Sequence, residues 1–146
     1  MKEFYGRVVM PGECKGKALV TKTGFNVLAT FSKSLVDADG SCVCYDVNNK
    51  ELYGKSLKGE IICIPQAIGS TSSGFMIQSI AAANIGPKAL LFARSADSLS
   101  VAGVIIADVW ENTEIITIDN LGDNFLDAVA EGNEIVVHKD GKVAVL

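Results

Sequence analysis

The chain has 146 residues, 49% of them hydrophobic, and a formal net charge of −4 with a sequence pI near 4.9. Its 13 basic residues are scattered rather than clustered, which argues against nucleic acid or an anionic membrane as a partner. No apolar run approaches the roughly 18 residues of a membrane span, and the charged N-terminus MKEFYGRVV differs from a signal peptide. We therefore expect a cytoplasmic protein with a single domain spanning residues 1–146.

The first 64 residues resemble a series of short β segments separated by glycines. The predicted strands are Phe4–Val9, Lys17–Thr21, Ser41–Asp46 and Gly59–Ile64. The second strand alternates between apolar and polar side chains, which is typical of a strand with one solvated face. In contrast, GEIICIP is almost entirely apolar and indicates a strand that is covered on both faces.

From Ser70 the apolar residues recur at helical spacing, which predicts a helix that ends at Gly86-Pro87. Its apolar stripe consists of Phe75, Ile77, Ile80, Ala81, Ala82 and Ile85. Later elements are predicted as strands at Lys88–Ala93, Ala102–Ala107 and Glu114–Ile118, a helix over Asn120–Glu131, and a hairpin of Glu134–His138 and Lys142–Leu146. The order indicates a mixed α/β fold in which β strands precede α/β units, with the change near Pro65.

Four cysteines occur in a chain without secretory features, so we expect reduced thiols rather than disulfides. They are Cys14, Cys42, Cys44 and Cys63. Cys42 and Cys44 are separated by one residue, a spacing that on a strand points both side chains to the same face and does not wrap them around one metal ion. The pattern favours two buried thiols over a metal site.

The segment IICIPQAIGSTSSGF is the most informative one, because a buried strand runs into a loop of small residues that opens a helix. Four hydroxyl residues occupy this opening: Ser70, Thr71, Ser72 and Ser73. Together with the backbone N–H groups of a helix start, their hydroxyls suit a carboxylate or a phosphate. Gly69 and Gly74 are expected to let the backbone come close to that ligand.

An ordinary capped helix is the alternative explanation of the same segment, because Ser and Thr are common N-caps and small residues are common in tight turns. One serine suffices for a cap, and four consecutive hydroxyl residues exceed that need. The segment alone leaves the capped helix and the binding loop equally open. A Walker phosphate loop is excluded by the missing lysine, and a GxSxG nucleophile elbow is absent.

Several segments together resemble the small-subunit domain of aconitase X-type enzymes, over at least Gly6 to Ile118. They are GRVVMPGECKGKALVTKTGFN, ELYGKSLKGEIICIP, GSTSSG, and IGPKALLF followed by ADSLSVAGVIIA. The resemblance implies a swivelling β/β/α domain similar to the small domain of aconitase, in a hydro-lyase. Known activities in the family are dehydration of cis-3-hydroxy-L-proline and of mevalonate 5-phosphate. Each needs a large subunit that carries an iron or iron–sulfur centre, so we expect this chain to bind no cofactor alone.

By the same resemblance, Ser70 matches the serine that acts as the catalytic base in aconitase-like enzymes and abstracts the proton next to the substrate carboxylate. Gly69, Thr71, Ser72 and Ser73 are then expected to contact the hydroxy-acid substrate. A serine hydroxyl is a weak base until its environment stabilises the alkoxide, and the positive end of a helix is one means of doing so. The implied partners are an aconitase X-type large subunit and a small hydroxy acid.

The chain departs from the family pattern in two places. Many members have an arginine just before the Gly-Ser pair, where this chain has Ala67-Ile68. The family's aromatic, glycine-rich segment near the substrate is expected around Asn26–Asp37, which here reads NVLATFSKSLVD. Arg94 replaces the missing cation only if the fold brings it to the loop. The alternative function is therefore a non-catalytic swivelling or docking module with a diverged site.

Other candidates have simpler explanations. His138, the only histidine, ends the predicted strand EIVVH and is expected to be a strand-end residue rather than a catalytic one. Without a histidine beside the serine loop, the chain also differs from the swivelling domains of phosphotransfer enzymes. DADG opens like a calcium loop, but no glutamate closes it at the required spacing. For Trp110, the sole tryptophan, an interface anchor and a buried side chain stay equally open.

Overall fold

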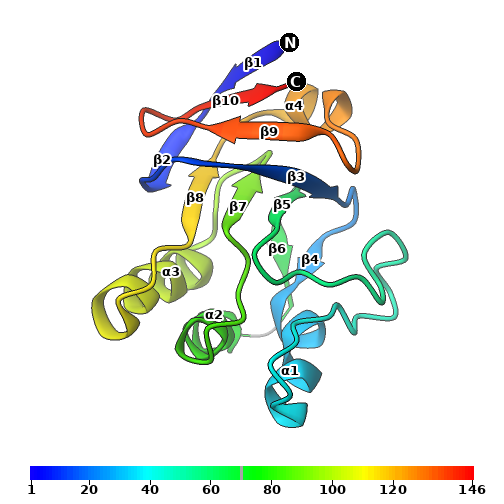
Figure 1. The fold of residues 1–146 in the computed structure, drawn as a ribbon, viewed down its shortest axis with the longest axis vertical. Coiled ribbons are helices and arrows are strands. Elements are labelled where there is room, and N and C mark those ends of the chain that lie inside the picture. Colours follow the sequence, from blue (N-terminus) through cyan, green and yellow to red (C-terminus); the bar gives the residue numbers. More distant parts are fainter. Residues whose placement is uncertain (70) are drawn as a thin grey trace.

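Two β layers and one layer of helices make up the structure, a computed structural model that describes residues 1–69 and 71–146. In Figure 1 the layer of β1, β9 and β10 lies at the top, the strands β5, β7 and β8 lie in the middle, and α1, α2 and α3 lie at the bottom. The predicted mixed α/β class and the β/β/α layering are confirmed.

One mixed sheet of eight strands forms both β layers. In spatial order its strands are β1 (Lys2–Tyr5), β10 (Lys142–Val145), β9 (Glu134–Val137), β3 (Cys14–Val20), β5 (Ile61–Ile64), β7 (Ala89–Phe92), β8 (Ile116–Asp119) and β2 (Arg7–Met10). A short parallel pair joins β4 (Phe25–Asn26) to β6 (Ala67–Ile68). The helices are α1 (Val27–Asp37), α2 (Ser73–Ala82), α3 (Ser98–Glu111) and α4 (Asp123–Ala128). Strands β3, β5, β7 and β8 run parallel, so their carboxyl ends share one edge.

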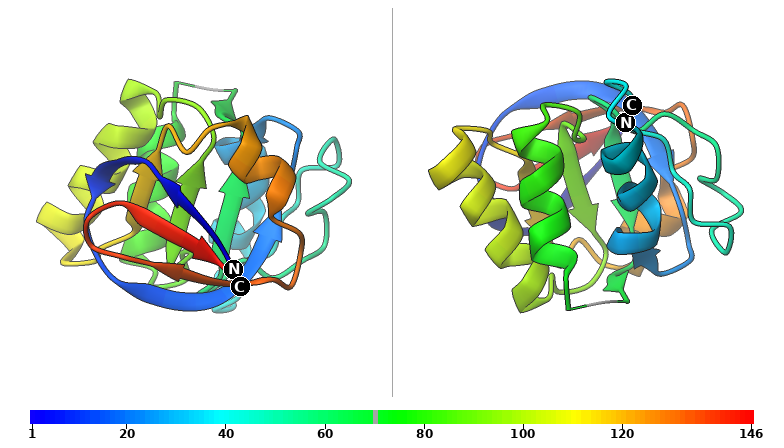
Figure 2. Two further views of the ribbon diagram at one scale, coloured as in Figure 1. Left: turned by 90° about the horizontal axis from the view of Figure 1, so that it is seen from above. Right: turned by 90° about the horizontal axis from the view of Figure 1, so that it is seen from below.

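Alternate residues of the parallel strands supply two separate cores. Ile62 and Ile64 of β5 pack with side chains of α1, α2 and α3, whereas Ile61 and Cys63 pack against β9, β10 and α4. All four residues of β5 are buried, which confirms that GEIICIP marks a strand covered on both faces. The two views of Figure 2 show these covers: β1, β10 and α4 from above, and the three longer helices from below.

The predicted strand Phe4–Val9 is divided in two at Gly6. Strand β1 pairs with β10, whereas β2 pairs with β8 at the opposite end of the strand order. A Cβ atom at Gly6 would lie 2.4 Å from the carbonyl oxygen of Asp119, so only glycine allows the chain to cross here. The other strands predicted between Lys17–Thr21 and the closing hairpin are confirmed, with two exceptions.

The first exception is the predicted strand Ala102–Ala107, which is wrong because these residues lie inside α3. The run VAGVIIA is short, apolar and rich in β-branched residues, and such a run does not distinguish a strand from a buried helix. Asp97 gives a local signal for the helix. Its side chain accepts hydrogen bonds from the backbone N–H and the hydroxyl of Ser100 and thereby caps the helix.

The second exception is Ser41–Asp46, whose described residues form no strand and make one isolated bridge, between Val43 and Ser56. Instead, Cys42 and Cys44 are fully buried in the core beneath the helices.

All four cysteines are free thiols, as predicted. Burial raises the pKa of the Cys42 thiol to about 12 and also raises the pKa of Cys63, so these thiols behave as small apolar side chains.

The helices differ from prediction mainly at their ends. Helix α2 begins at Ser73 rather than Ser70 and ends at Ala82, and α4 is shorter than the predicted Asn120–Glu131. Phe75, expected in the apolar stripe of α2, is 66% exposed. Helix α1 was not predicted. In the part of the chain that the structure describes, no helix combines the length and apolar character that crossing a bilayer requires.

Candidate functional site

The loop of hydroxyl residues lies where several elements begin. Helices α1, α2 and α3 lie side by side, and in the right view of Figure 2 all three begin at the end of their layer where β6 leads into α2. Their first backbone N–H groups have no partner within the helix and carry partial positive charge. Ligands of open parallel sheets bind at this kind of edge, beyond the carboxyl ends of the strands.

Gly69 has a backbone conformation that glycine adopts and other residues rarely do, with φ of +104°. A Cβ atom at this position would lie 2.8 Å from both Cγ and Oδ1 of Asn26. The pairing of β4 with β6 sets this contact, because it places Asn26 opposite Ile68. The glycine is therefore needed both for its φ and for its lack of a side chain. Ser70, the predicted base, lies outside the described residues.

Asn26 was not among the predicted site residues. Its side-chain Oδ1 accepts a hydrogen bond from the backbone N–H of Ala29 at 3.0 Å and caps α1. The segment Asn26–Asp37, expected to be near the substrate, thus forms a helix whose first turn contacts Gly69. An asparagine followed by apolar residues at Val27 and Phe31 is an N-terminal helix signal that was available in the sequence.

The three described hydroxyl residues differ in exposure. Thr71 is exposed, Ser72 is half-buried at the N-cap position of α2, and Ser73 is buried. Of these three, Thr71 is the one whose side chain is open to solvent. Ser72 holds the N-cap position of α2 without a side-chain capping hydrogen bond, so the capped-helix explanation is not confirmed, and Thr71 is exposed to solvent.

Gly74, predicted to approach a ligand, instead packs against α3. A Cβ atom at Gly74 would lie 2.9 Å from the carbonyl oxygen of Leu99, and one at Gly103 would lie 2.9 Å from both Cα and the carbonyl oxygen of Gly74. The two glycines let the backbones of α2 and α3 come close directly behind the loop. The close contact therefore holds the first turn of α2 against α3.

Arg94 follows β7 and lies at the edge of the sheet where the loop begins. Its backbone N–H donates to the carbonyl of Pro65 at 3.1 Å, which places Arg94 beside the segment that leads to Gly69. The side chain is 56% exposed, and its Nε lies 3.9 Å from the Asp123 carboxylate, a long distance for an ion pair. The fold thus brings the backbone of Arg94 to the edge that carries the loop, while its guanidinium lies beside Asp123 at the start of α4.

Arg7 is the second arginine at this edge, and it is held by a carboxylate. It forms two hydrogen bonds with Asp119, from Nε at 2.9 Å and from Nη2 at 2.5 Å, and Asp119 is fully buried. The hydrogen bond with Asp119 raises the pKa of the Arg7 guanidinium. Asp119 also accepts from the backbone N–H of Ala96 at 2.7 Å. The pair joins β2, β8 and the turn before α3, and no local signal predicts it because its members are 112 residues apart.

The remaining candidates lie elsewhere or have structural roles. His138 lies in the β9–β10 turn, in the layer opposite α1–α3, where its N–H donates to the carbonyl of Lys142. Asp39 of DADG accepts hydrogen bonds from Ser41 in a local turn. Trp110 is 72% exposed, so the buried alternative is wrong. Among residues 1–69 and 71–146, no group of three or more His, Cys, Asp or Glu side chains is arranged to hold a metal.

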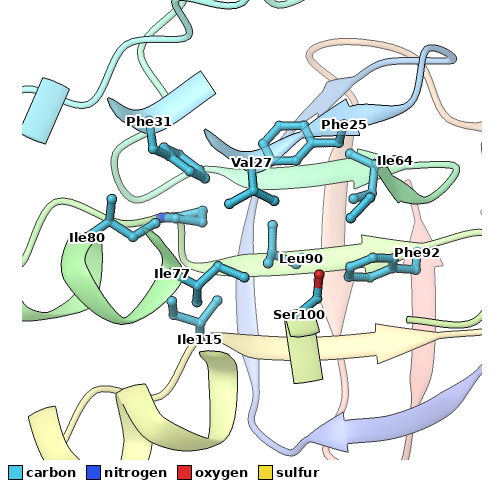
Figure 3. Close-up of a pocket in the computed structure, with 12 residues that line it drawn as sticks. Phe25, Val27, Phe31, Ile64, Ile77, Ile80, Leu90, Phe92, Ser100 and Ile115 are labelled. Atoms are coloured by element: carbon cyan, nitrogen blue, oxygen red, sulfur yellow. The ribbon is translucent and has the colours of Figure 1, made fainter. Parts of the chain in front are cut away.

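An enclosed cavity lies between the helices and the sheet, lined by apolar side chains and by Ser100 (Figure 3). Phe25, Ile64, Ile77 and Phe92 are among the residues that point into it. Its volume of about 10 Å³ is close to the space of a single water molecule. A carboxylate or phosphate substrate does not fit, so this cavity is a packing void of the core.

Comparison with known proteins gives a consistent result. The family model of the aconitase X swivel domain matches residues 3–145. The chain is similar to the phosphomevalonate dehydratase small subunit of Archaeoglobus fulgidus, with 25% identity over 138 residues that cover 94% of this chain and 93% of the relative. The corresponding small subunit of Methanothrix thermoacetophila is 30% identical over 138 residues, covering 94% and 90%. Aconitase X of Thermococcus kodakaraensis, solved in its holo-form, matches with a TM-score of 0.82 and 23% identity, over 100% of this chain and 99% of that one.

Proposed function

The chain belongs to the aconitase X swivel domain family, and on this basis we propose that it is the small subunit of a two-subunit hydro-lyase. The substrate is a β-hydroxy carboxylate. Of the two substrates expected from the family, mevalonate 5-phosphate is favoured over cis-3-hydroxy-L-proline. The observation that carries this choice is the match, over nearly the full length of both chains, to relatives named phosphomevalonate dehydratase small subunit.

In the proposed reaction Ser70 is the base. It accepts the proton from the carbon next to the substrate carboxylate, the electron pair left behind forms a double bond to the neighbouring carbon, and the hydroxyl of that carbon leaves with a proton as water. The position of Ser70 directly after Gly69 in the sequence supports this role, because Gly69 has a conformation that favours glycine and lies against the side chain of Asn26. The start of α2 supplies positive potential that favours a serine alkoxide.

The substrate anions are held, in this proposal, by the N-terminal turn of α2 and by Arg94. Exposed Thr71 offers a hydroxyl, and Ser72 and Ser73 bring backbone N–H groups of the helix start. Arg94 takes the place of the arginine that many family members carry before the Gly-Ser pair. Its exposed guanidinium matches a carboxylate or phosphate in geometry and charge.

The iron or iron–sulfur centre expected from the family does not fit the described part of this chain. No cluster of ligand side chains exists among the described residues, and Cys42, Cys44 and Cys63 are buried within packed cores. We assign the centre to the large subunit and route no step through a metal on this chain. Four free thiols also suit the reducing cytoplasm, which we propose as the location.

Co-expression with the cognate large subunit tests this function. The purified complex is expected to dehydrate mevalonate 5-phosphate, as followed by NMR of the unsaturated product, and to act poorly on cis-3-hydroxy-L-proline. Ser70→Ala should abolish the reaction and leave the complex intact, whereas the control Ser32→Ala in α1 should retain it. Full activity of Ser70→Ala would exclude the serine base. A complex that assembles without activity on either substrate would favour the docking module.

A further inference from the structure

The outer face of α2 and α3 is apolar and exposed. We call the set Phe75, Leu99, Ile105, Val109 and Trp110 the α2–α3 face, because each of these side chains is an exposed large hydrophobic residue of one of the two helices. On α3 the exposed positions Leu99, Ala102, Ile105 and Val109 recur at intervals of three or four residues. This spacing lines one side of a helix.

Charged side chains are missing from this face. Helices Ser73–Ala82 and Ser98–Glu111, both fully described, contain only two charged residues, Asp108 and Glu111, and both are half-buried. Glu111 accepts a hydrogen bond from Gln78 at 2.8 Å, in the contact between the helices. The chain as a whole is 21% charged. A helix that is apolar on its outer side as well as its inner side is characteristic of a buried helix.

The other two helices of the same chain show what an ordinary solvated face looks like. Helix α1 exposes Lys33 and Asp37, which form an ion pair four residues apart. Helix α4 exposes Asp123 and Asp127. Among the described helices the lack of exposed charge is therefore a feature of α2 and α3, and a group of exposed apolar side chains of this kind is typical of an interaction site.

The α2–α3 face begins beside the candidate site. Phe75 lies in the first turn of α2, three residues after Ser72. Leu99 lies in the first turn of α3, and its carbonyl oxygen is the atom nearest to a Cβ built at Gly74. A chain that covers Gly69 and the residues Thr71–Ser73 would therefore also lie close to Phe75 and Leu99.

We propose that the α2–α3 face is the docking surface for the large subunit, with Val109 and Trp110 as its principal contacts. This inference rests on the proposed function, since the large subunit is the occupant. The curated relatives that match this chain over nearly their whole length are named small subunits, which supports a large subunit as the occupant of this face. The complementary surface is an uncharged apolar patch that accepts the Trp110 ring, a residue type enriched at binding hot spots.

Binding of purified chains tests the surface directly. The wild-type chain and variants Val109→Lys and Trp110→Ala are titrated against the cognate large subunit by calorimetry, after circular dichroism has verified the fold of each. Both variants are expected to bind at least about tenfold more weakly. The matched control is Val36→Lys on α1, at a valine that is 82% exposed but lies outside the α2–α3 face, and it should bind like wild type.

The outcomes separate this inference from the proposed function. If the large subunit binds both variants as tightly as wild type, the surface is wrong while the two-subunit enzyme stands. If the wild-type chain does not bind the large subunit, both fail. Light scattering of the isolated chain tests the other possible occupant of the α2–α3 face, which is a second copy of this chain. A wild-type dimer that Val109→Lys converts to a monomer, without change in large-subunit affinity, would overturn the proposal.

Discussion

The side chain of Asn26 occupies the space where a side chain of Gly69 would otherwise lie, with 2.8 Å between Asn26 Cγ and an ideal Cβ position at Gly69. Asn26 thus caps α1 and also leaves no space for a side chain at position 69, directly before the proposed base. The contact links two segments that are 43 residues apart in sequence numbering, Asn26 and Gly69, through the β4–β6 pair. The site is therefore built from two chain segments and not from the hydroxyl-rich loop alone.

Replacing Gly69 by alanine should damage both folding and activity. The change imposes a side chain at φ of +104° and a clash with Asn26, and we expect a loss of about 2 kcal/mol or more in unfolding free energy together with loss of dehydration. Gly132→Ala is the matched control, because its φ is +84° with no atom within 4 Å of the added Cβ. The control should cost about 1 kcal/mol and leave dehydration unchanged. Equal effects of the two variants in urea unfolding would show that the Asn26 contact is unimportant.

Arg94→Ala should weaken substrate binding. Loss of a charge-assisted hydrogen bond to a substrate anion is worth about 1.5–3 kcal/mol, so we expect KM to rise at least about tenfold with little change in kcat. Arg94→Lys should recover part of the affinity, because it keeps the charge but loses the planar fork. Lys58→Ala serves as control, since the Lys58 ammonium bonds the carbonyl of Gly40 in a turn away from the loop. Unchanged KM in Arg94→Ala would remove Arg94 from the site.

Gly103→Ala should destabilise the protein, although alanine favours helices by about 1 kcal/mol over glycine. The added Cβ would lie 2.9 Å from backbone atoms of Gly74, and these atoms have no rotamer by which to move away. Overpacking of about 1–3 kcal/mol should exceed the gain in propensity. Gly86→Ala, whose nearest contact is an ordinary 3.5 Å to Ile80, should change unfolding by less than about 0.5 kcal/mol. A stabilised Gly103→Ala protein in thermal unfolding would contradict close packing of α2 on α3.

Buried thiols should make stability fall at alkaline pH. Burial raises the pKa of Cys42 from its ordinary 9.0 to about 12 in the folded chain. Below pH 9 the thiol is protonated in both states, and above it only the unfolded chain ionises, so stability is lost as the pH rises from about 9 to about 12. The slope reaches at most about 1.4 kcal/mol per pH unit for one thiol. In urea titrations at pH 8 and pH 10, Cys42→Ala should lose less stability between the two pH values than wild type does. An identical loss in both proteins would contradict the raised pKa.

The sequence by itself determined the elements that carry a clear local signal. Strand β5 is a continuous apolar run, the β9–β10 hairpin turns at Asp140-Gly141, and the loop before α2 combines glycine with hydroxyl residues. These features depend on neighbours in sequence, and so composition and spacing reveal them. The family assignment rested on the same segments, and it correctly implied the β/β/α layers.

The tertiary structure decided the elements whose signal was ambiguous. The run Ala102–Ala107 has a local helix cap at Asp97, and the contact that distinguishes it from a strand at long range is the packing of Gly103 on Gly74. The outer face of α3 is apolar, so the alternation that normally marks a surface helix is absent. The contact of Asn26 with Gly69, the ion pair of Arg7 with Asp119, and the place of Arg94 beside Pro65 likewise depend on strand order. Strand order is a long-range property that local spacing does not encode, because pairing energies arise only when the strands meet.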